Sequence, residues 1–120
     1  MNVRAIRGAI TIPENTRESI LEGTRELLTE IINRNAINPS DLISLIFTLT
    51  TDLNAAFPAV AARDIGLVDV PLMCASELEV PGSLSRCVRI LAHLNCEKAN
   101  DELNHVYLRG AKVLRPDLVK

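Results

Sequence analysis

The strongest periodic pattern in the chain is a stripe of apolar residues with helical spacing that continues to about Arg34. Its members recur about every 3.6 residues and are Ile20, Leu21, Thr24, Leu27, Leu28, Ile31 and Ile32. The opposite face interleaves carboxylates with arginines, which is typical of a solvated helix surface. Asn15 and Glu18 stand three residues apart, as in a capping box, and predict where this helix begins.

Five other segments have the patterns expected of strands. Residues 42–49 form a nearly continuous apolar run, which predicts a strand buried on both faces. Residues 85–94 alternate between two faces, with Arg89 on one and Ile90 on the other. The remaining strands are expected over residues 3–12, 68–75 and 105–113. Pro71 marks an edge or an irregularity, because proline cannot donate to a strand ladder.

Short helical segments separate these strands. Asn38 followed by Pro39 predicts a helical turn over 38–41, and Pro58 can open a helix over 59–65. A further short helix is expected over 100–104. The resulting order predicts an α/β domain, bordering on α+β, with a mixed sheet and helices on one face.

At 120 residues the chain has the usual length of one domain, so a single domain over 1–120 is expected. Helices on one face leave the other face of the sheet uncovered. In a chain this short the cover must come from neighbouring subunits, which predicts an oligomer.

Composition excludes several classes of protein. The chain has 13 Lys and Arg against 15 Asp and Glu, a net charge of −2, which argues against nucleic acid as the main partner. Its apolar content of 48% argues against disorder. No run of about 18 apolar residues exists, so no membrane-spanning helix is expected. The first residues lack the apolar stretch of a secretory signal, so a cytoplasmic location is expected.

The cysteines do not predict a redox or metal site. Cys74, Cys87 and Cys96 form no CxxC pair, and free thiols fit a reducing compartment. His93 and Cys96, with Glu97 nearby, match no metal-ligand signature, so we interpret them as core or strand-surface residues. Nothing in the sequence brings Cys74 to a histidine as a catalytic pair.

Arginines are the more informative residues. Ten of the 13 basic residues are Arg, and Arg89 interrupts an otherwise apolar strand face. Arginine is costly to bury unless it meets an anion. Spacing alone leaves two interpretations open for Arg89: a bound ligand, or an ion pair with Glu77 or Glu79. Several arginines with a Tyr hydroxyl would suit a small ligand that carries two or more carboxylates.

Five separated motifs resemble the monofunctional bacterial chorismate mutases of the trimeric α/β class. They are Arg4-x-Ile6-Arg7-Gly8-Ala9, Phe57-Pro58-Ala59-x-Ala61-x-Arg63, Val70-Pro71-x-x-Cys74-x-x-Glu77, Cys87-x-Arg89, and His105-Val106-Tyr107-Leu108 followed by Val113-Leu114-Arg115-Pro116-Asp117-Leu118. The resemblance runs in order from residue 2 to residue 118.

This resemblance implies the pericyclic rearrangement of chorismate to prephenate, toward phenylalanine and tyrosine, without metal or cofactor. It implies that Arg89 donates to the ether oxygen of the breaking bond. Glu77 would face the ring and bind its hydroxyl, with Cys74 beside it. Arg7 and Tyr107 would hold the side-chain carboxylate.

The same resemblance implies a homotrimer, a pseudo-α/β-barrel with active sites between subunits. Phe57, Ala59 and Arg63 would come from the adjacent subunit. Leu114 and Arg115 would begin a tail that closes over the site.

Three features depart from the family pattern. Val60 stands where related enzymes often carry Lys, so substrate affinity is expected to rest more on Arg63 and Arg115. Residues 65–70 are one residue shorter in a surface turn, and the tail after the last motif is short.

Two other functions remain open at this point. An enamine/imine deaminase of the same architecture would not explain the placement of Arg7, Glu77 and Arg89. A non-catalytic trimeric module that binds an amino acid or another carboxylate would share the arginines but would not need Glu77. Fold alone does not separate these functions.

Overall fold

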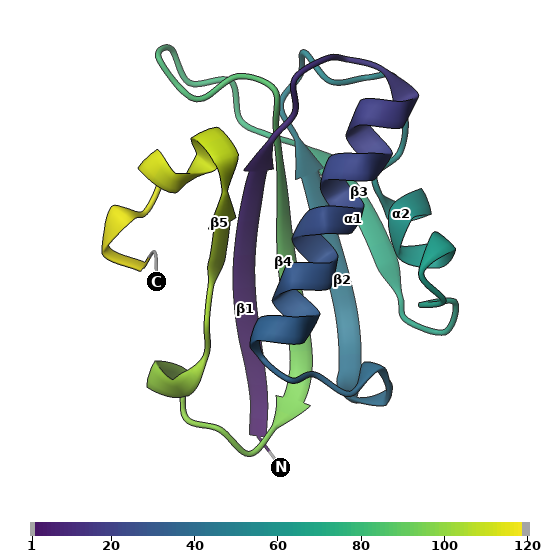
Figure 1. Ribbon diagram of the computed structural model, residues 1–120, viewed down its shortest axis with the longest axis vertical. Coiled ribbons are helices and arrows are strands. Elements are labelled where there is room, and N and C mark those ends of the chain that lie inside the picture. Colours follow the sequence, from purple (N-terminus) through teal and green to yellow (C-terminus); the bar gives the residue numbers. More distant parts are fainter. Residues whose placement is uncertain (1, 119–120) are drawn as a thin grey trace.

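A five-stranded mixed sheet forms the centre of the computed structural model, which describes residues 2–118 (Figure 1). The strands are β1 (Asn2–Thr11), β2 (Leu42–Leu49), β3 (Leu72–Ser76), β4 (Cys87–Cys96) and β5 (Val106–Leu108), in the spatial order β3-β2-β4-β1-β5. The central strand β4 runs antiparallel to both β1 and β2. Each outer strand pairs in parallel, β3 with β2 and β5 with β1.

Two α-helices cover one face of this sheet, as the sequence predicted. The long helix α1 (Arg17–Arg34) runs obliquely over the sheet and packs against β1, and α2 (Ala59–Asp64) packs beside it against β3 (Figure 1). Short 3₁₀ turns at Pro39–Asp41, Asn100–Glu102, Arg109–Val113 and Pro116–Leu118 complete the described elements. Within residues 2–118 the structure holds no helix with the length and apolarity needed to span a bilayer.

The main core lies between the helices and the covered face of the sheet. On β4, Val88, Ile90 and Ala92 point under the helices and are buried, whereas Arg89 and Leu91 point to the opposite face and are half-buried. The alternation predicted for this strand is therefore confirmed. We call the side without helices the open face.

The start of α1 differs from the prediction by one residue. Thr16, not Asn15, is the N-cap: its backbone is extended and its hydroxyl accepts the N–H of Ser19. Asn15 instead holds a loop, because its side-chain carbonyl accepts the N–H groups of Asn54 and Ala55. Two polar residues in succession could each cap a helix, and tertiary contacts select between them.

Two strand predictions need correction on the β2–β3 side. β2 is buried on one face only: Leu45 and Phe47 are buried, whereas Ile46 and Thr48 are half-buried because no second layer within residues 2–118 covers the open face. β3 begins at Leu72 rather than near Val68, since Pro71 lacks an N–H and only its carbonyl joins the sheet, accepting from Leu45.

The predicted last strand is much shorter than expected. It ends at Leu108 because Arg109 adopts a positive φ of 54°, and the chain continues as a 3₁₀ turn. The Arg109 guanidinium donates to the Thr11 carbonyl and pairs with Glu26 on α1. Likewise β4 starts at Cys87, after Arg86 with a φ of 44°, and runs on to Cys96.

The short helical segments agree better with their predictions. Asn38 caps the turn Pro39–Asp41 by accepting the N–H of Ser40, and Pro58 precedes α2. The segment predicted as a helix over 100–104 is a 3₁₀ turn at Asn100–Glu102.

Candidate active site

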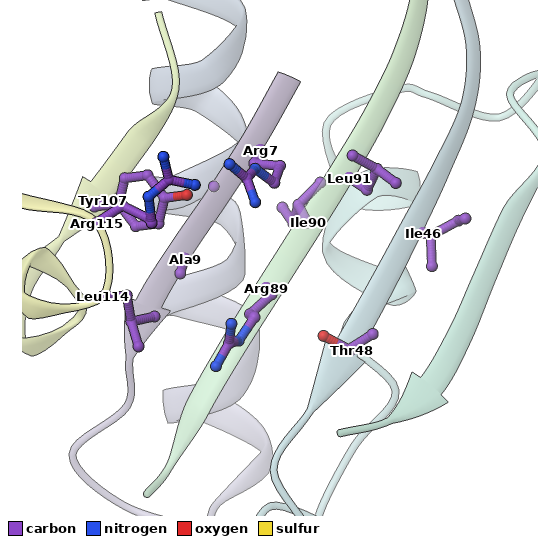
Figure 2. Close-up of a pocket in the computed structure, with 11 residues that line it drawn as sticks. Arg7, Ala9, Ile46, Thr48, Arg89, Ile90, Leu91, Tyr107, Leu114 and Arg115 are labelled. Carbon is purple, nitrogen blue, oxygen red and sulfur yellow. The ribbon is translucent and has the colours of Figure 1, made fainter. Parts of the chain in front are cut away.

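A cavity of about 320 Å³ lies on the open face, where β2, β4, β1 and β5 stand side by side (Figure 2). Its lining comes from all four strands and from the chain that follows β5. The lining residues are Arg7, Gly8, Ala9, Ile46, Thr48, Arg89, Ile90, Leu91, Tyr107, Leu114 and Arg115. Its volume suits a small metabolite.

One row of residues across the four strands builds the middle of this cavity. Strand pairing places Thr48 opposite Arg89, Arg89 opposite Ala9, and Ala9 opposite Tyr107. Directly paired residues point to the same face, so these four side chains share the open face. We call them the open-face row. Ala9 has the smallest side chain of the row, which leaves space between the Arg89 guanidinium and Tyr107 (Figure 2).

Three arginines give the cavity its charge. Arg7 lies two residues before Ala9 on β1 and therefore points to the same side as Arg89. Arg115 reaches the cavity from the segment after β5 (Figure 2). A cavity lined by three guanidinium groups and a phenol, among apolar side chains, is suited to an anionic ligand with more than one carboxylate.

Arg89 is held by a carboxylate next to the cavity. Its Nε lies 3.2 Å from Glu77 Oε1, and the Thr48 hydroxyl donates to the same oxygen. Within residues 2–118 the buried Nε finds no acceptor aligned for a hydrogen bond, so the contact with Glu77 is an ion pair only. The Arg89 side chain is 40% exposed against 20% for Glu77, which leaves the guanidinium accessible to a ligand.

The two interpretations of Arg89 therefore do not exclude each other. The ion pair is with Glu77, and the same guanidinium lines the cavity. Glu79 has a different partner, the hydroxyl of Thr51. Glu77 itself is fixed by its backbone, whose N–H donates to the Leu49 carbonyl at 2.8 Å.

Thr48 is a site residue that sequence reasoning missed. It follows Phe47 in the apolar run of β2 and is the polar member of the strand opposite Arg89. A hydroxyl within an apolar run was a usable signal, but the run was interpreted as buried on both faces. The open face of β2 makes Thr48 available to Glu77.

The segment after β5 carries an ion pair close to the cavity. Arg115 Nη2 lies 2.9 Å from Asp117 Oδ2. This hydrogen bond is the main cause that lowers the pKa of the Asp117 carboxyl below its ordinary 3.8 and raises the pKa of Arg115, and Arg7 adds a smaller contribution at Asp117. A carboxylate of the chain thus neutralises part of the arginine cluster. The short tail's last residues, Val119 and Lys120, lie outside the described residues.

Cys74 does not lie beside Glu77 in the cavity of Arg89. It pairs with Phe47, so it points toward the helices, where it packs against the core and borders a separate cavity with Phe57. Glu77 follows three residues later, an odd spacing that places it toward the open face with Arg89. Strand alternation therefore separates the two residues.

The residues expected from an adjacent subunit lie apart from the cavity within one chain. Phe57 is 72% exposed, and Arg63 is exposed on α2. Ala59 is buried in the first turn of α2. The structure thus brings together Arg7, Arg89, Tyr107, Leu114 and Arg115, with Glu77 in contact through Arg89.

His93 and the cysteines lie in surroundings that suggest a structural rather than a chemical role. His93 Nδ1 lies 3.0 Å from the Ser44 hydroxyl on the neighbouring strand. All three cysteines are free, and burial raises the pKa of the Cys87 thiol above its ordinary 9.0. Among the described residues no group of three His, Cys, Asp or Glu side chains is placed to hold a metal ion.

Comparisons with known proteins agree on one family. The family model for chorismate mutase type I matches residues 3–118. A chorismate mutase AroH from Thermus thermophilus is 53% identical over 117 residues, which covers 97% of this chain and 96% of the relative. A chorismate mutase AroH from Bacillus subtilis (strain 168) is 41% identical over 119 residues, with 98% and 94% covered. The solved structure of a chorismate mutase from Clostridium thermocellum superimposes with a TM-score of 0.90, at 49% identity, covering 92% of this chain and 98% of that one.

Proposed function

This chain belongs to the chorismate mutase type I family and is a chorismate mutase, an isomerase, and we propose that the cavity on the open face is its active site. The observation that carries this proposal is the open-face row, which sets a half-exposed guanidinium and a phenol on either side of a small residue. The conversion of chorismate to prephenate is an intramolecular rearrangement. The site therefore has to bind one dianion in a folded conformation and stabilise the charge that develops in it.

Arg89 supplies the main electrostatic effect. As the C–O bond of chorismate breaks, negative charge grows on the ether oxygen, and a donor already in place stabilises that charge without reorganising. The ion pair with Glu77 holds Arg89 Nε in place while the guanidinium stays accessible from the cavity. Such a preorganised donor is typically worth about 10²–10³ in kcat.

Glu77 has the complementary role. Positive charge develops on the ring as the bond breaks, and a carboxylate on the ring side balances it. Glu77 also binds the ring hydroxyl in this proposal. Glu77 lies next to Arg89 and accepts a hydrogen bond from the Thr48 hydroxyl. A module that only binds carboxylates would not need a carboxylate at this position.

Arg7, Tyr107 and Arg115 hold the carboxylates of the substrate. Arg7 and Tyr107 come from paired strands, and Arg115 comes from the segment that follows. In the free enzyme the Arg115 guanidinium is paired with the Asp117 carboxylate. A substrate carboxylate replaces Asp117 there, and Leu114 closes beside it.

The functional unit in this proposal is a cytoplasmic homotrimer of single-domain subunits over residues 1–120. It is supported by the open face, which residues 2–118 leave uncovered, and by the exposed Phe57. Phe57, Ala59, Arg63 and Cys74 then complete the site of an adjacent subunit. Because position 60 in α2 is Val rather than Lys, the affinity for the substrate rests more on Arg63 and Arg115.

The decisive experiment follows chorismate disappearance by ultraviolet absorbance, without added metal, for the wild type and Arg89→Ala. We expect kcat to fall by about 10²–10³ in the variant, with unchanged elution volume and thermal unfolding. Arg25→Ala is the matched control, because Arg25 forms an exposed ion pair with Asp64 on the helical side, and the kcat of this variant should stay at the wild-type value. Equal turnover by Arg89→Ala and the wild type would place the active site elsewhere.

A further inference from the structure

The backbone N–H of Arg7 is bonded by a side chain rather than by a backbone carbonyl. It donates to the imidazole Nδ1 of His105 at 3.0 Å. The parallel pairing of β1 with β5 begins one residue later, with Gly8 opposite Val106. His105 therefore extends the contact between the two strands by one residue, at the position of a proposed substrate-binding arginine.

The residue before His105, Asn104, forms its backbone hydrogen bonds with the side chain of Asn35 rather than with β1. The Asn104 carbonyl accepts from Asn35 Nδ2 at 2.9 Å, and the Asn104 N–H donates to Asn35 Oδ1 at 2.7 Å. Asn35 is buried at the C-terminal end of α1 and also donates to the Ile31 carbonyl. This double hydrogen bond anchors the entry to β5 on the helix, so the side chain of His105 makes the link to β1.

This link lies between two groups that must act together. Tyr107 is two residues after His105, and it pairs with Ala9, which is two residues after Arg7. β5 pairs with β1 through three residues, and the contact of His105 lies at the start of this pairing, whereas Arg109 and Gly110 hold its other end by hydrogen bonds to Thr11. A shift at His105 would change the distance between the Arg7 guanidinium and the Tyr107 hydroxyl.

We propose that His105 is a positioning residue for substrate binding, whose Nδ1 fixes the Arg7 backbone relative to Tyr107. The inference rests on the proposed function, because it assumes that Arg7 and Tyr107 bind the same carboxylate. An Nδ1 that accepts a hydrogen bond carries no proton, so the neutral ring holds its proton on Nε2. This role requires an acceptor atom at the position of Nδ1, and it does not require the imidazole ring itself.

Three substitutions separate the acceptor from the shape of the ring. In His105→Asn the side-chain oxygen stands near the place of Nδ1, in His105→Gln it lies one carbon further out, and His105→Leu has no acceptor. We expect the KM for chorismate to stay within about 2-fold of wild type in the Asn variant and to rise roughly 3- to 10-fold in the Gln and Leu variants, the range of one lost hydrogen bond. Because the substrate and the transition state lose the same contact, kcat should change little. Equal KM values in all three variants and the wild type would overturn the inference.

A double-substitution cycle distinguishes this role from a structural one. Arg7→Ala, His105→Leu and the double variant are compared by their dissociation constants for a bicyclic dicarboxylate that mimics the transition state. If His105 acts through Arg7, its substitution changes the constant much less in the Arg7→Ala background. An equal change in both backgrounds would overturn the positioning role while leaving the proposed function intact. No effect of Arg7→Ala itself would overturn the assigned role of Arg7, and the inference with it.

Discussion

Two adjacent rows of the sheet show how one set of strands serves two purposes. The open-face row contains Thr48, Arg89, Ala9 and Tyr107. The row beside it contains Phe47, Ile90, Gly8 and Val106, which pair in the same way and point under the helices; we call it the covered-face row. Each member of one row is the chain neighbour of a member of the other. A step of one residue along any strand thus leads from the core to the site.

The rows differ in what restricts their residues. In the covered-face row space is the limit: a Cβ added to Gly8 would lie 2.8 Å from Ile31 Cδ1 and 3.1 Å from the Val106 carbonyl oxygen. In the open-face row the side chains are polar or small and line a cavity. We conclude that the covered face sets stability and the open face sets catalysis, so substitutions in the two rows should change different measured quantities.

Phe47→Ala tests the covered-face row and should have the largest effect on stability. Phe47 is fully buried, and its truncation leaves a cavity that neighbouring side chains cannot fill. We expect the free energy of unfolding to fall by about 3–5 kcal/mol, measured by urea unfolding at fixed protein concentration. The kcat of the folded fraction should stay close to wild type. A loss of stability under about 1 kcal/mol would contradict the division between the rows.

Much of the covered face could be predicted from the sequence, because burial produces periodic patterns. The stripe of α1 and the alternation of β4 both correspond to buried side chains in the structure. Strand ends were predicted less well. β5 ends just before Arg109 and β4 begins just after Arg86. Both of these residues have a positive φ, and neither is a glycine that would have signalled a turn.

The open face could be predicted only in part, because its residues follow chemistry rather than periodicity. Arg89 stood out as a charge in an apolar strand, and the structure gives it the carboxylate partner Glu77. The roles of Arg7 and Tyr107 came from family resemblance, and strand pairing shows why they share a cavity. The polarity of Thr48 was visible in the apolar run, but its partner Glu77 and the contact of His105 with Arg7 depend on how separate segments align, which no pattern within one strand contains.

Arg89→Lys asks whether the open-face row needs charge alone or a guanidinium. The Arg89 guanidinium contacts Glu77 through Nε and presents its other N–H groups to the cavity. Lysine keeps the positive charge but lacks this forked group. We expect a loss nearly as large as in the Ala variant, about 2.7–4 kcal/mol in activation free energy, with an unchanged unfolding midpoint. Steady-state kinetics with chorismate measure it, and Arg25→Lys is the control. Turnover near wild type would show that charge without geometry is sufficient.

Thr48→Val should have the smallest effect and bears most directly on the boundary between the rows. Thr48 is the chain neighbour of Phe47, yet its hydroxyl donates to the Glu77 oxygen that pairs with Arg89. Valine keeps the shape and removes that donor, so kcat/KM should fall by roughly 2- to 10-fold, the value of one hydrogen bond. Thr48→Ser restores the hydroxyl and should restore kcat/KM.

Ser44→Ala is the matched control for Thr48→Val, because Ser44 lies on the same face of β2 but bonds His93, outside the cavity. It should leave kcat/KM unchanged. If Thr48→Val lowered the unfolding midpoint and left kcat/KM unchanged, Thr48 would belong with Phe47 as a residue that supports the fold. If only kcat/KM falls, then a single step along β2 separates the residue that stabilises the sheet from the residue that orients Glu77.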